Sequence, residues 1–93
     1  MAHHELKTDS EVFQAVVAGL KTYEIRRDDR GFQVGDVLYL RETVHTGEEM
    51  KNGAPLEYSG HSAIAAVTHI LRGPIYGLAD GWAILSVDVT RVE

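Results

Sequence analysis

Only one segment of the chain has the apolar spacing of an α-helix. Its apolar side chains recur at steps of one, three and four residues, which places them on one stripe of a helix. These side chains are Val12, Phe13, Val16, Val17 and Leu20. We predict a helix over residues 9–18 that ends with Gly19 in a left-handed conformation. Thr8 and Glu11 have the spacing of a capping box at its start. Because the rest of the chain lacks this spacing, the remaining core must come from strands.

The other segments are rich in β-branched and aromatic residues or alternate between apolar and polar side chains, which is typical of strands. We predict strands over residues 4–7, 21–27, 36–43, 56–58, 62–71 and 82–89. Turns are expected at residues 28–31, 35–36 and 59–61, and loops at 44–55 and 72–81. The first loop has no apolar period, two glycines and a proline, so we expect it to be mobile. Five or six short strands with one early helix predict an α+β fold, a small mixed β-barrel that closes its own sheet edges.

The expected core combines the helix stripe with one face of each strand. Its predicted members are Phe13, Val16, Val17, Ile25, Leu38, Leu40, Ile64, Val67, Leu85 and Val87. Ile25 lies on the opposite face of its strand from Glu24 and Arg26. We expect Ile25 to face inward and the two charged side chains to face a cleft or solvent.

Length and composition bound the class of protein. With 93 residues, the chain fits one domain over residues 1–93. It contains no cysteine, which excludes disulfides, thiolate metal sites and cysteine nucleophiles. No apolar run approaches the roughly 20 residues of a membrane span, and residues 1–5 do not resemble a signal peptide. We therefore expect a cytoplasmic protein that does not bind membranes.

The net charge is −5 at neutral pH, and the basic residues concentrate in the first half of the chain. Residues 1–41 carry six of the nine Lys and Arg side chains, so an anion-binding surface is expected there. So few basic groups argue against long duplexes, whose affinity depends on neutralising many phosphates. A single nucleoside, a flexible RNA end or a modified base is a better match.

The densest polar stretch, residues 21–30, contains four of the nine basic residues. Within it, Glu24 and Arg26 point to one face of the predicted strand, about 6–7 Å apart along the chain. A carboxylate that accepts and a guanidinium that donates in fixed directions suit a nucleobase or a phosphate. A solvent-exposed Glu–Arg pair is the simpler alternative. Lys21 either neutralises the end of the helix dipole or contacts a phosphate in a cleft.

The remaining polar residues show no catalytic or metal-binding pattern. None of the five histidines has the spacing of a metal site. The run Ser59-Gly60-His61-Ser62 lacks the flanking glycines of a nucleophile elbow and is better explained by a turn. We expect no metal and no cofactor.

Several segments together resemble the ASCH domain, and more closely a bacterial and phage branch of that family. The resemblance rests on His4-Glu5-Leu6-Lys7, on the run from Gly19 to Phe32 and on Gly35-Asp36. Later segments also fit, at residues 38–42, 58–60, 67–71 and 76–82, so the resemblance covers nearly the whole chain. Asp28 stands where this branch usually has Asn, a near-isosteric change that adds a negative charge.

The resemblance implies a PUA-like β-barrel with a helix beside a cleft, and a role in binding RNA or a nucleotide-like small molecule. We expect the cleft to involve Lys21, Glu24, Arg26 and Arg30, with Lys7 and Arg41 as auxiliary charges. The expected function is therefore a non-enzymatic binding module.

The same family contains small amidohydrolases that deacetylate acetylated cytidine, through a Lys, a Thr nucleophile three residues later and a distant Glu. Lys21 matches the Lys, but Glu24 occupies the Thr position and is not an alcohol nucleophile. That mechanism does not carry over as it stands. The alternative function is a hydrolase of acylated or otherwise modified nucleosides, in which Glu24 acts as a general base supported by Lys21. A structural or protein-binding domain is the third possibility.

Overall fold

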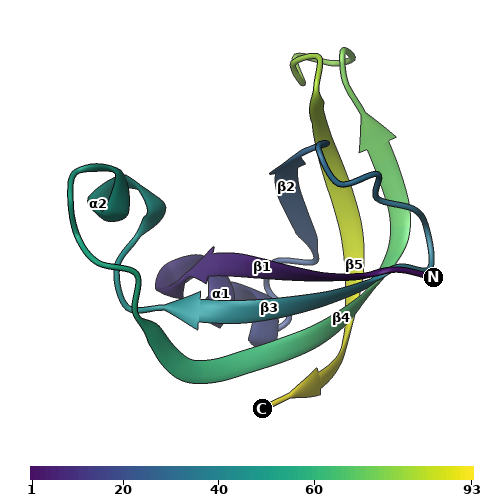
Figure 1. Cartoon of the computed structure of the whole chain (residues 1–93). Coiled ribbons are helices and arrows are strands. Elements are labelled where there is room, and N and C mark those ends of the chain that lie inside the picture. Colours follow the sequence, from purple (N-terminus) through teal and green to yellow (C-terminus); the bar gives the residue numbers. More distant parts are fainter.

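A five-stranded sheet curls into a half-barrel (Figure 1). The computed structural model describes all of residues 1–93. The strands are β1 (His3–Asp9), β2 (Tyr23–Arg27), β3 (Val37–Thr43), β4 (Tyr58–Arg72) and β5 (Trp82–Val92), in the order β1-β3-β4-β5-β2. β1 runs parallel to β3, and every other pair is antiparallel. The predicted mixed α+β architecture is present, but no backbone ladder joins the edge strands β1 and β2. The sheet is therefore open along the gap between these two strands, which we call the seam.

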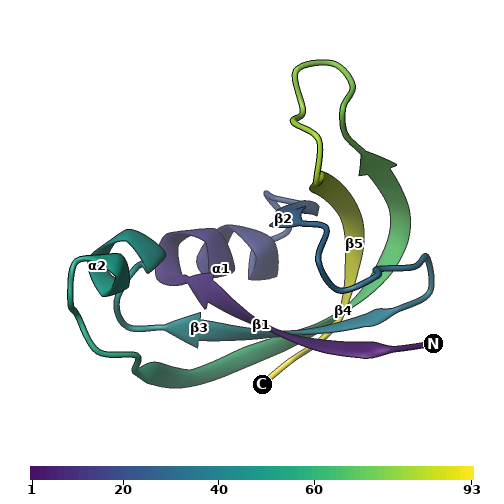
Figure 2. The same cartoon turned by 45° about the horizontal axis from the view of Figure 1, so that its top comes forward.

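The helix α1 (Ser10–Val17) packs inside the curl against β1, β3 and β5 (Figure 2). Its apolar stripe drives this packing, because Phe13 and Val16 are buried. The helix ends as predicted: Gly19 has a φ of 76°, and its N–H donates to the Val16 carbonyl at 3.1 Å. A left-handed glycine thus satisfies the carbonyls at the end of the helix.

The predicted capping box at the start of α1 is wrong. Thr8 belongs to β1, whose ladder with β3 runs as far as the pair Asp9 and Thr43. No side chain caps the first turn of α1, and the Thr8 hydroxyl donates instead to the Leu6 carbonyl. The reason is tertiary, because pairing with β3 keeps Thr8 in an extended conformation.

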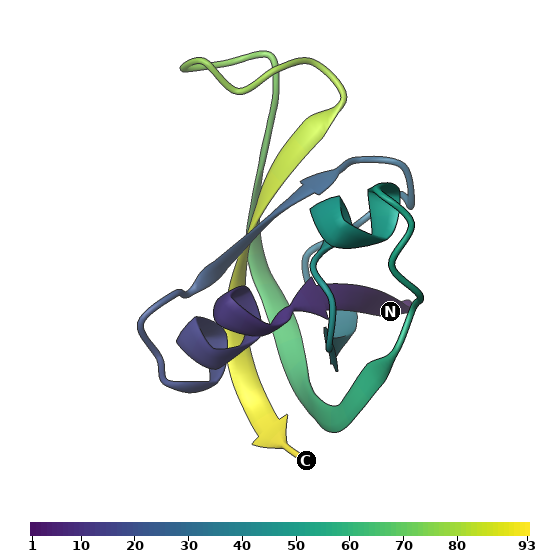
Figure 3. The same cartoon turned by 90° about the vertical axis from the view of Figure 1, so that its left-hand side faces the viewer.

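β4 and β5 are longer than predicted and form a bent two-stranded arm (Figure 3). β4 continues through the expected turn, where Gly60 has a φ of 98°. Its first residue, Tyr58, pairs with Thr43 beyond a bulge in β4, so the ladder extends past the turn signal. β5 likewise extends to Val92, which pairs with Ala63 on β4.

A second, short helix, α2 (Gly47–Lys51), interrupts the loop predicted over residues 44–55. It begins with a complete capping box: the Glu49 N–H donates to the Thr46 hydroxyl at 3.0 Å, and the Thr46 N–H donates to the Glu49 carboxylate at 2.9 Å. The Thr-x-x-Glu spacing is visible in the sequence. The helix is too short for an apolar period to develop, so the pattern of side chains predicted a loop.

The core lies between α1 and the concave face of the sheet. Its buried apolar members are Leu6, Phe13, Val16, Phe32, Leu38, Leu40, Ala63, Ala65, Val67, Ala83, Leu85 and Val87. Seven of the ten side chains expected in the core are among them. Val17 and Ile64 are half-buried. The prediction for Ile25 is wrong, because half of its surface is exposed. Neither helix has the length and apolar content needed to cross a membrane.

Asp36 ties the N-terminal residues to the start of β3. Its carboxylate accepts hydrogen bonds from the Ala2 N–H at 3.0 Å and the Gln33 N–H at 2.9 Å, and it lies 2.9 Å from His4 Nε2. The backbone bond from Ala2, followed by the contacts of His4 and Gln33, lowers the pKa of Asp36 to about 2. This carboxylate therefore helps to hold β1 beside β3, on the side away from the seam.

Candidate functional site

A buried carboxylate lies at the seam. Glu24 is only 2% exposed, although it belongs to the edge strand β2. It faces the interior because the register between β2 and β5 places it opposite the buried Leu85. The alternation of a strand then turns Ile25 outward, which explains why the prediction for that residue fails. A buried carboxylate is costly unless it is paired, so the partners of Glu24 define the site.

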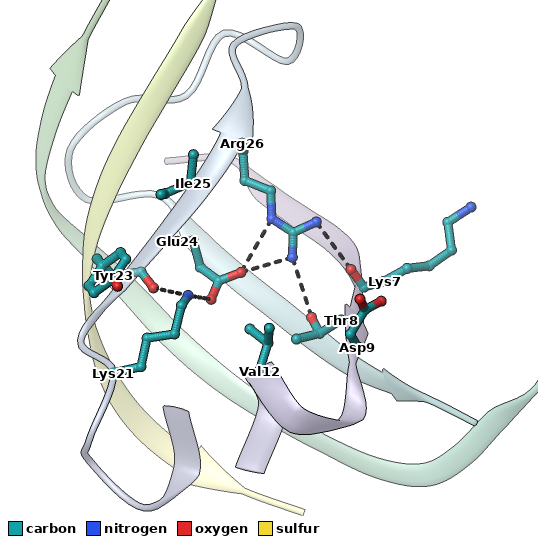
Figure 4. Close-up of a pocket in the computed structure, with 9 residues that line it drawn as sticks. All are labelled: Lys7, Thr8, Asp9, Val12, Lys21, Tyr23, Glu24, Ile25 and Arg26. Atoms are coloured by element: carbon teal, nitrogen blue, oxygen red, sulfur yellow. Dashed lines mark hydrogen bonds and ion pairs between the residues drawn. The ribbon is translucent and has the colours of Figure 1, made fainter. Parts of the chain in front are cut away.

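Two cations hold Glu24 from opposite sides (Figure 4). Lys21 Nζ donates to Oε2 at 2.8 Å, and Arg26 donates to Oε1 through Nη2 at 2.8 Å and Nε at 3.3 Å. The Lys21 and Arg26 side chains are themselves only 19% and 23% exposed. Lys21 Nζ also donates to the Tyr23 carbonyl and lies 4.6 Å from the centre of the Tyr23 ring. The three charges are therefore held in fixed positions by the chain itself.

Arginine side chains bridge the seam that the backbone leaves open. Arg26 Nη1 donates to the Lys7 carbonyl at 3.1 Å, and Arg26 Nη2 donates to Thr8 Oγ1 at 3.4 Å. Arg30 Nη1 donates to the Glu5 carbonyl at 2.7 Å. Glu5 and Lys7 are alternate residues of β1, so their carbonyls point toward the same edge of the strand. Side chains thus replace part of the missing ladder between β1 and β2.

An open cleft of about 320 Å³ lies beside these contacts, and we call it the seam cleft. Its lining residues are Lys7, Thr8, Asp9, Val12, Lys21, Tyr23, Glu24, Ile25 and Arg26. Three cations and two carboxylates line it, so the cleft carries a small excess of positive charge in a chain of net charge −5. Sequence reasoning missed Tyr23 and Ile25, which flank Glu24 on β2, and also Thr8, Asp9 and Val12. The last three reach the cleft only through the packing of β1 and α1 beside β2, which no local pattern shows.

The six residues that the sequence proposed as ligand-binding do not all lie together. Those that line the seam cleft are Lys7, Lys21, Glu24 and Arg26. Arg30 lines a smaller neighbouring pocket. Arg41 lies outside both cavities, with its guanidinium 3.5 Å from the centre of the Tyr58 ring and 3.4 Å from the Glu5 carboxylate. Arg41 therefore has a packing role on the sheet and is not part of the cleft.

The seam cleft offers few donors and acceptors, and their directions are fixed. Lys21 uses two of its three N–H donors and Arg26 uses four of its five, so each keeps one. Glu24 accepts three hydrogen bonds, which leaves about one of its roughly four lone-pair sites. The Thr8 hydroxyl donates to the Leu6 carbonyl and contacts Arg26 rather than a base. It therefore has no partner that could activate it as a nucleophile.

Comparison with known protein families assigns the chain to a family. The model of the family described as a domain of unknown function (DUF3850) matches residues 3–87. The chain belongs to this family. The match includes β1, α1 and β2, and so contains every residue that lines the seam cleft. No curated protein sequence matches the chain.

Besides Glu24 and Asp36, this DUF3850 domain contains a third buried carboxylate, Glu42 in β3. Its oxygens accept hydrogen bonds from Ser59 Oγ at 2.7 Å, Ser10 Oγ at 2.8 Å and Gln14 Nε2 at 2.9 Å. The bond from Ser59 is the main cause that lowers the pKa of Glu42 below its usual value. Glu42 lines none of the cavities, so it links α1, β3 and β4 rather than facing a ligand. No group of three or more His, Asp or Glu side chains is arranged to hold a metal ion.

Proposed function

We propose that this domain is a binding module for RNA or a nucleotide-like ligand, and that the ligand occupies the seam cleft. One observation carries the proposal. The buried carboxylate of Glu24 fixes Lys21 and Arg26 beside an open cavity, and each cation keeps one free N–H donor. The resemblance of the sequence to the ASCH domain, with its PUA-like barrel and proposed RNA-binding role, supports the same function.

The donors and the acceptor of the cleft match the edges of a nucleotide. The free N–H groups of Lys21 and Arg26 suit a phosphate oxygen or the carbonyl of a base. The remaining acceptor site of Glu24 suits an amino group of a base or a sugar hydroxyl. Tyr23, which is 42% exposed and lines the cleft, adds an aromatic surface on which a base can stack.

The charge of the protein limits the size of the ligand. Three cations line the cleft, and two of them already neutralise Glu24. Duplex binding requires many phosphate contacts, each of which contributes to the affinity through counterion release. A nucleotide or the single-stranded end of an RNA needs few such contacts, so we propose a ligand of this size.

An NMR titration tests the proposal. We would add cytidine monophosphate, and separately a short single-stranded RNA, to ¹⁵N-labelled protein. The expected result is a saturable set of shifts confined to residues that line the seam cleft. Lys21→Met, which keeps an apolar stem but removes the charge, should weaken binding about tenfold. Lys51→Met on the exposed surface of α2 is the matched control and should bind normally. Shifts that are absent, or that lie elsewhere, would contradict the proposal.

The alternative function is a hydrolase of acylated nucleosides, favoured by the 2.8 Å contact between Lys21 Nζ and Glu24 inside a cleft. In that case Glu24 would take a proton from water, the water oxygen would add to the amide carbonyl, and the amine would leave with a proton. Both oxygens of Glu24 already accept hydrogen bonds from cations, which opposes this role. Incubation with acetylated cytidine, followed by chromatography, decides the question. Turnover that disappears in Glu24→Gln, with binding retained, would establish the hydrolase instead.

A further inference from the structure

Two arginines have no acidic partner, although acidic residues outnumber basic ones by 14 to nine. The other four arginines each form a salt bridge, in the pairs Arg26–Glu24, Arg41–Glu5, Arg72–Asp28 and Arg91–Glu93. Arg27 and Arg30 form none. Because the chain has a surplus of carboxylates, these two arginines could have been paired with acidic residues. Their lack of an acidic partner therefore needs an explanation other than charge neutralisation.

Arg27 and Arg30 line the same small cavity. It has a volume of about 150 Å³, and its lining consists of Leu6, Arg26, Arg27, Asp29, Arg30 and Phe32. We call it the arginine pocket. Three arginines and one acidic residue, Asp29, line it, so the pocket carries excess positive charge even though Arg26 is neutralised by Glu24.

The guanidinium groups of the pocket are held in place by neutral partners. Arg30 Nη1 donates to the Glu5 carbonyl at 2.7 Å, and the Arg27 guanidinium lies 5.4 Å from the centre of the Trp82 ring. Neither contact reduces the positive charge, and Arg30 retains four of its five N–H donors. A set of positioned, unpaired guanidinium donors is the arrangement that recognises oxyanions through paired hydrogen bonds.

We propose that the arginine pocket binds a phosphoryl group. Its volume equals that of about five water molecules, which accommodates a tetrahedral oxyanion but not a base together with a sugar. The phosphoryl group presents several acceptor oxygens and up to two negative charges, which match the donors of Arg27 and Arg30. The buried side chains of Leu6 and Phe32 supply the apolar part of the pocket lining.

The arginine pocket also sets the orientation of a ligand bound in the seam cleft. Arg26 lines both cavities, so one molecule can place its phosphate in the arginine pocket and its nucleoside in the seam cleft. This step rests on the proposed function, whereas phosphate binding in the arginine pocket does not. It identifies the ligand class as a nucleoside monophosphate or a phosphorylated RNA end, in preference to a free nucleoside.

The test first measures the binding of inorganic phosphate to the protein, at constant ionic strength set with sodium chloride. The arginine Nε–H resonances of ¹⁵N-labelled protein report on the guanidinium groups directly. Phosphate should shift the signals of Arg27 and Arg30 saturably. Arg27→Ala should weaken phosphate binding by about tenfold or more. This variant suits the test because the Arg27 side chain makes no hydrogen bond or salt bridge within the protein, so the fold should persist.

Arg91→Ala is the matched control, because Arg91 lies at the far end of β5 and is 68% exposed. It should bind phosphate as the unchanged protein does. The proposal is overturned if phosphate produces no saturable shift at Arg27 and Arg30, or if Arg27→Ala and Arg91→Ala bind phosphate equally. Arg30→Ala provides a second arm: it should also lose phosphate binding, and unchanged binding in this variant would likewise overturn the proposal.

A second titration separates this proposal from the proposed function. Cytidine monophosphate should bind the unchanged protein about tenfold more tightly than cytidine, and Arg27→Ala should abolish that difference without weakening the binding of cytidine. If phosphate binds the arginine pocket but neither nucleoside nor nucleotide binds the seam cleft, the proposed function fails and the phosphate site stands. If cytidine and cytidine monophosphate bind the cleft equally in every variant, the proposed function stands and the placement of the nucleotide phosphate in the arginine pocket fails.

Discussion

Removal of the Glu24 carboxylate should be among the most damaging single changes in this domain. In Glu24→Ala, Lys21 and Arg26 lose the partner that neutralises them, and the hydrogen bonds at 2.8, 2.8 and 3.3 Å disappear. Removing one partner of a buried ion pair costs about 3–5 kcal/mol. The two cations are about one-fifth exposed and can regain some hydration, so we expect the lower end of that range, about 3 kcal/mol.

Such a loss is a large share of the total stability of the domain. A chain of this length has a free energy of unfolding of roughly 5–14 kcal/mol. A loss of about 3 kcal/mol corresponds to a fall in Tm of roughly 12–24 °C. Urea denaturation followed by circular dichroism measures the free energy, and a thermal melt measures Tm. Glu24→Gln keeps one acceptor oxygen, so its free energy of unfolding should lie between those of Glu24→Ala and the unchanged protein.

Glu5→Ala is the matched control for Glu24→Ala. Glu5 also contacts an arginine, Arg41, at 3.4 Å, but its side chain is 55% exposed. An exposed pair of this kind contributes about 0–1 kcal/mol. The reasoning is refuted if Glu24→Ala and Glu5→Ala lower the free energy of unfolding by the same small amount with an unchanged m-value. The seam would then be held by contacts other than the three charges around Glu24.

The remaining predictions concern the core, the N-terminal contacts and a loop. Phe13→Ala should lower the free energy of unfolding by about 3–5 kcal/mol, because the ring is 2% exposed; an unchanged urea midpoint would show that the helix face is misassigned. The pKa of Asp36 is lowered from 3.8 to about 2, so the stability that it contributes is present above pH 3.8 and is lost as the pH falls through about 2. Asp36→Asn should therefore reduce the acid-induced loss of stability, and a pH series of urea titrations checks this. Gly73→Ala should cost about 1–3 kcal/mol, because its Cβ would lie 2.1 Å from the Ala79 carbonyl oxygen. Gly47→Ala, with its nearest atom at 3.9 Å, should leave the thermal melt nearly unchanged.

Local patterns predicted the elements that depend on local spacing. The apolar stripe and the left-handed Gly19 located α1, and the β-rich runs located the five strands, with errors at the ends. The separate strand predicted over residues 56–58 is wrong, because Tyr58 is the first residue of the continuous strand β4. The errors arose where pairing between strands overrides a local signal. The ladder with β3 draws Thr8 into β1, and the ladders of β4 continue through Gly60. The short α2 shows the opposite case, since its capping box was readable but its length hid the helical period.

Part of the candidate site was also readable from the sequence. The two-residue period of a strand places Glu24 and Arg26 on one face, and Lys21 precedes them in the same polar run. The same period could not say which face is buried, and the apolar Ile25 favoured the wrong one. The presence of Thr8 in the cleft could not be foreseen either, because it depends on where β1 lies relative to β2.

The sequence by itself determined that this chain lacks cysteine and has an early helix, several strands and a cluster of charge over residues 21–30. Only the tertiary structure decided that Glu24 faces inward. A carboxylate can be buried there because β2 is an edge strand, so Lys21 and Arg26 can reach it from the open side. Two further donors of Arg26 are accepted by β1, at the Lys7 carbonyl and the Thr8 hydroxyl. Tertiary packing also decided which arginines are paired and which, Arg27 and Arg30, remain unpaired in a common pocket. Pairing of charges depends on distance in space, and strand order sets that distance.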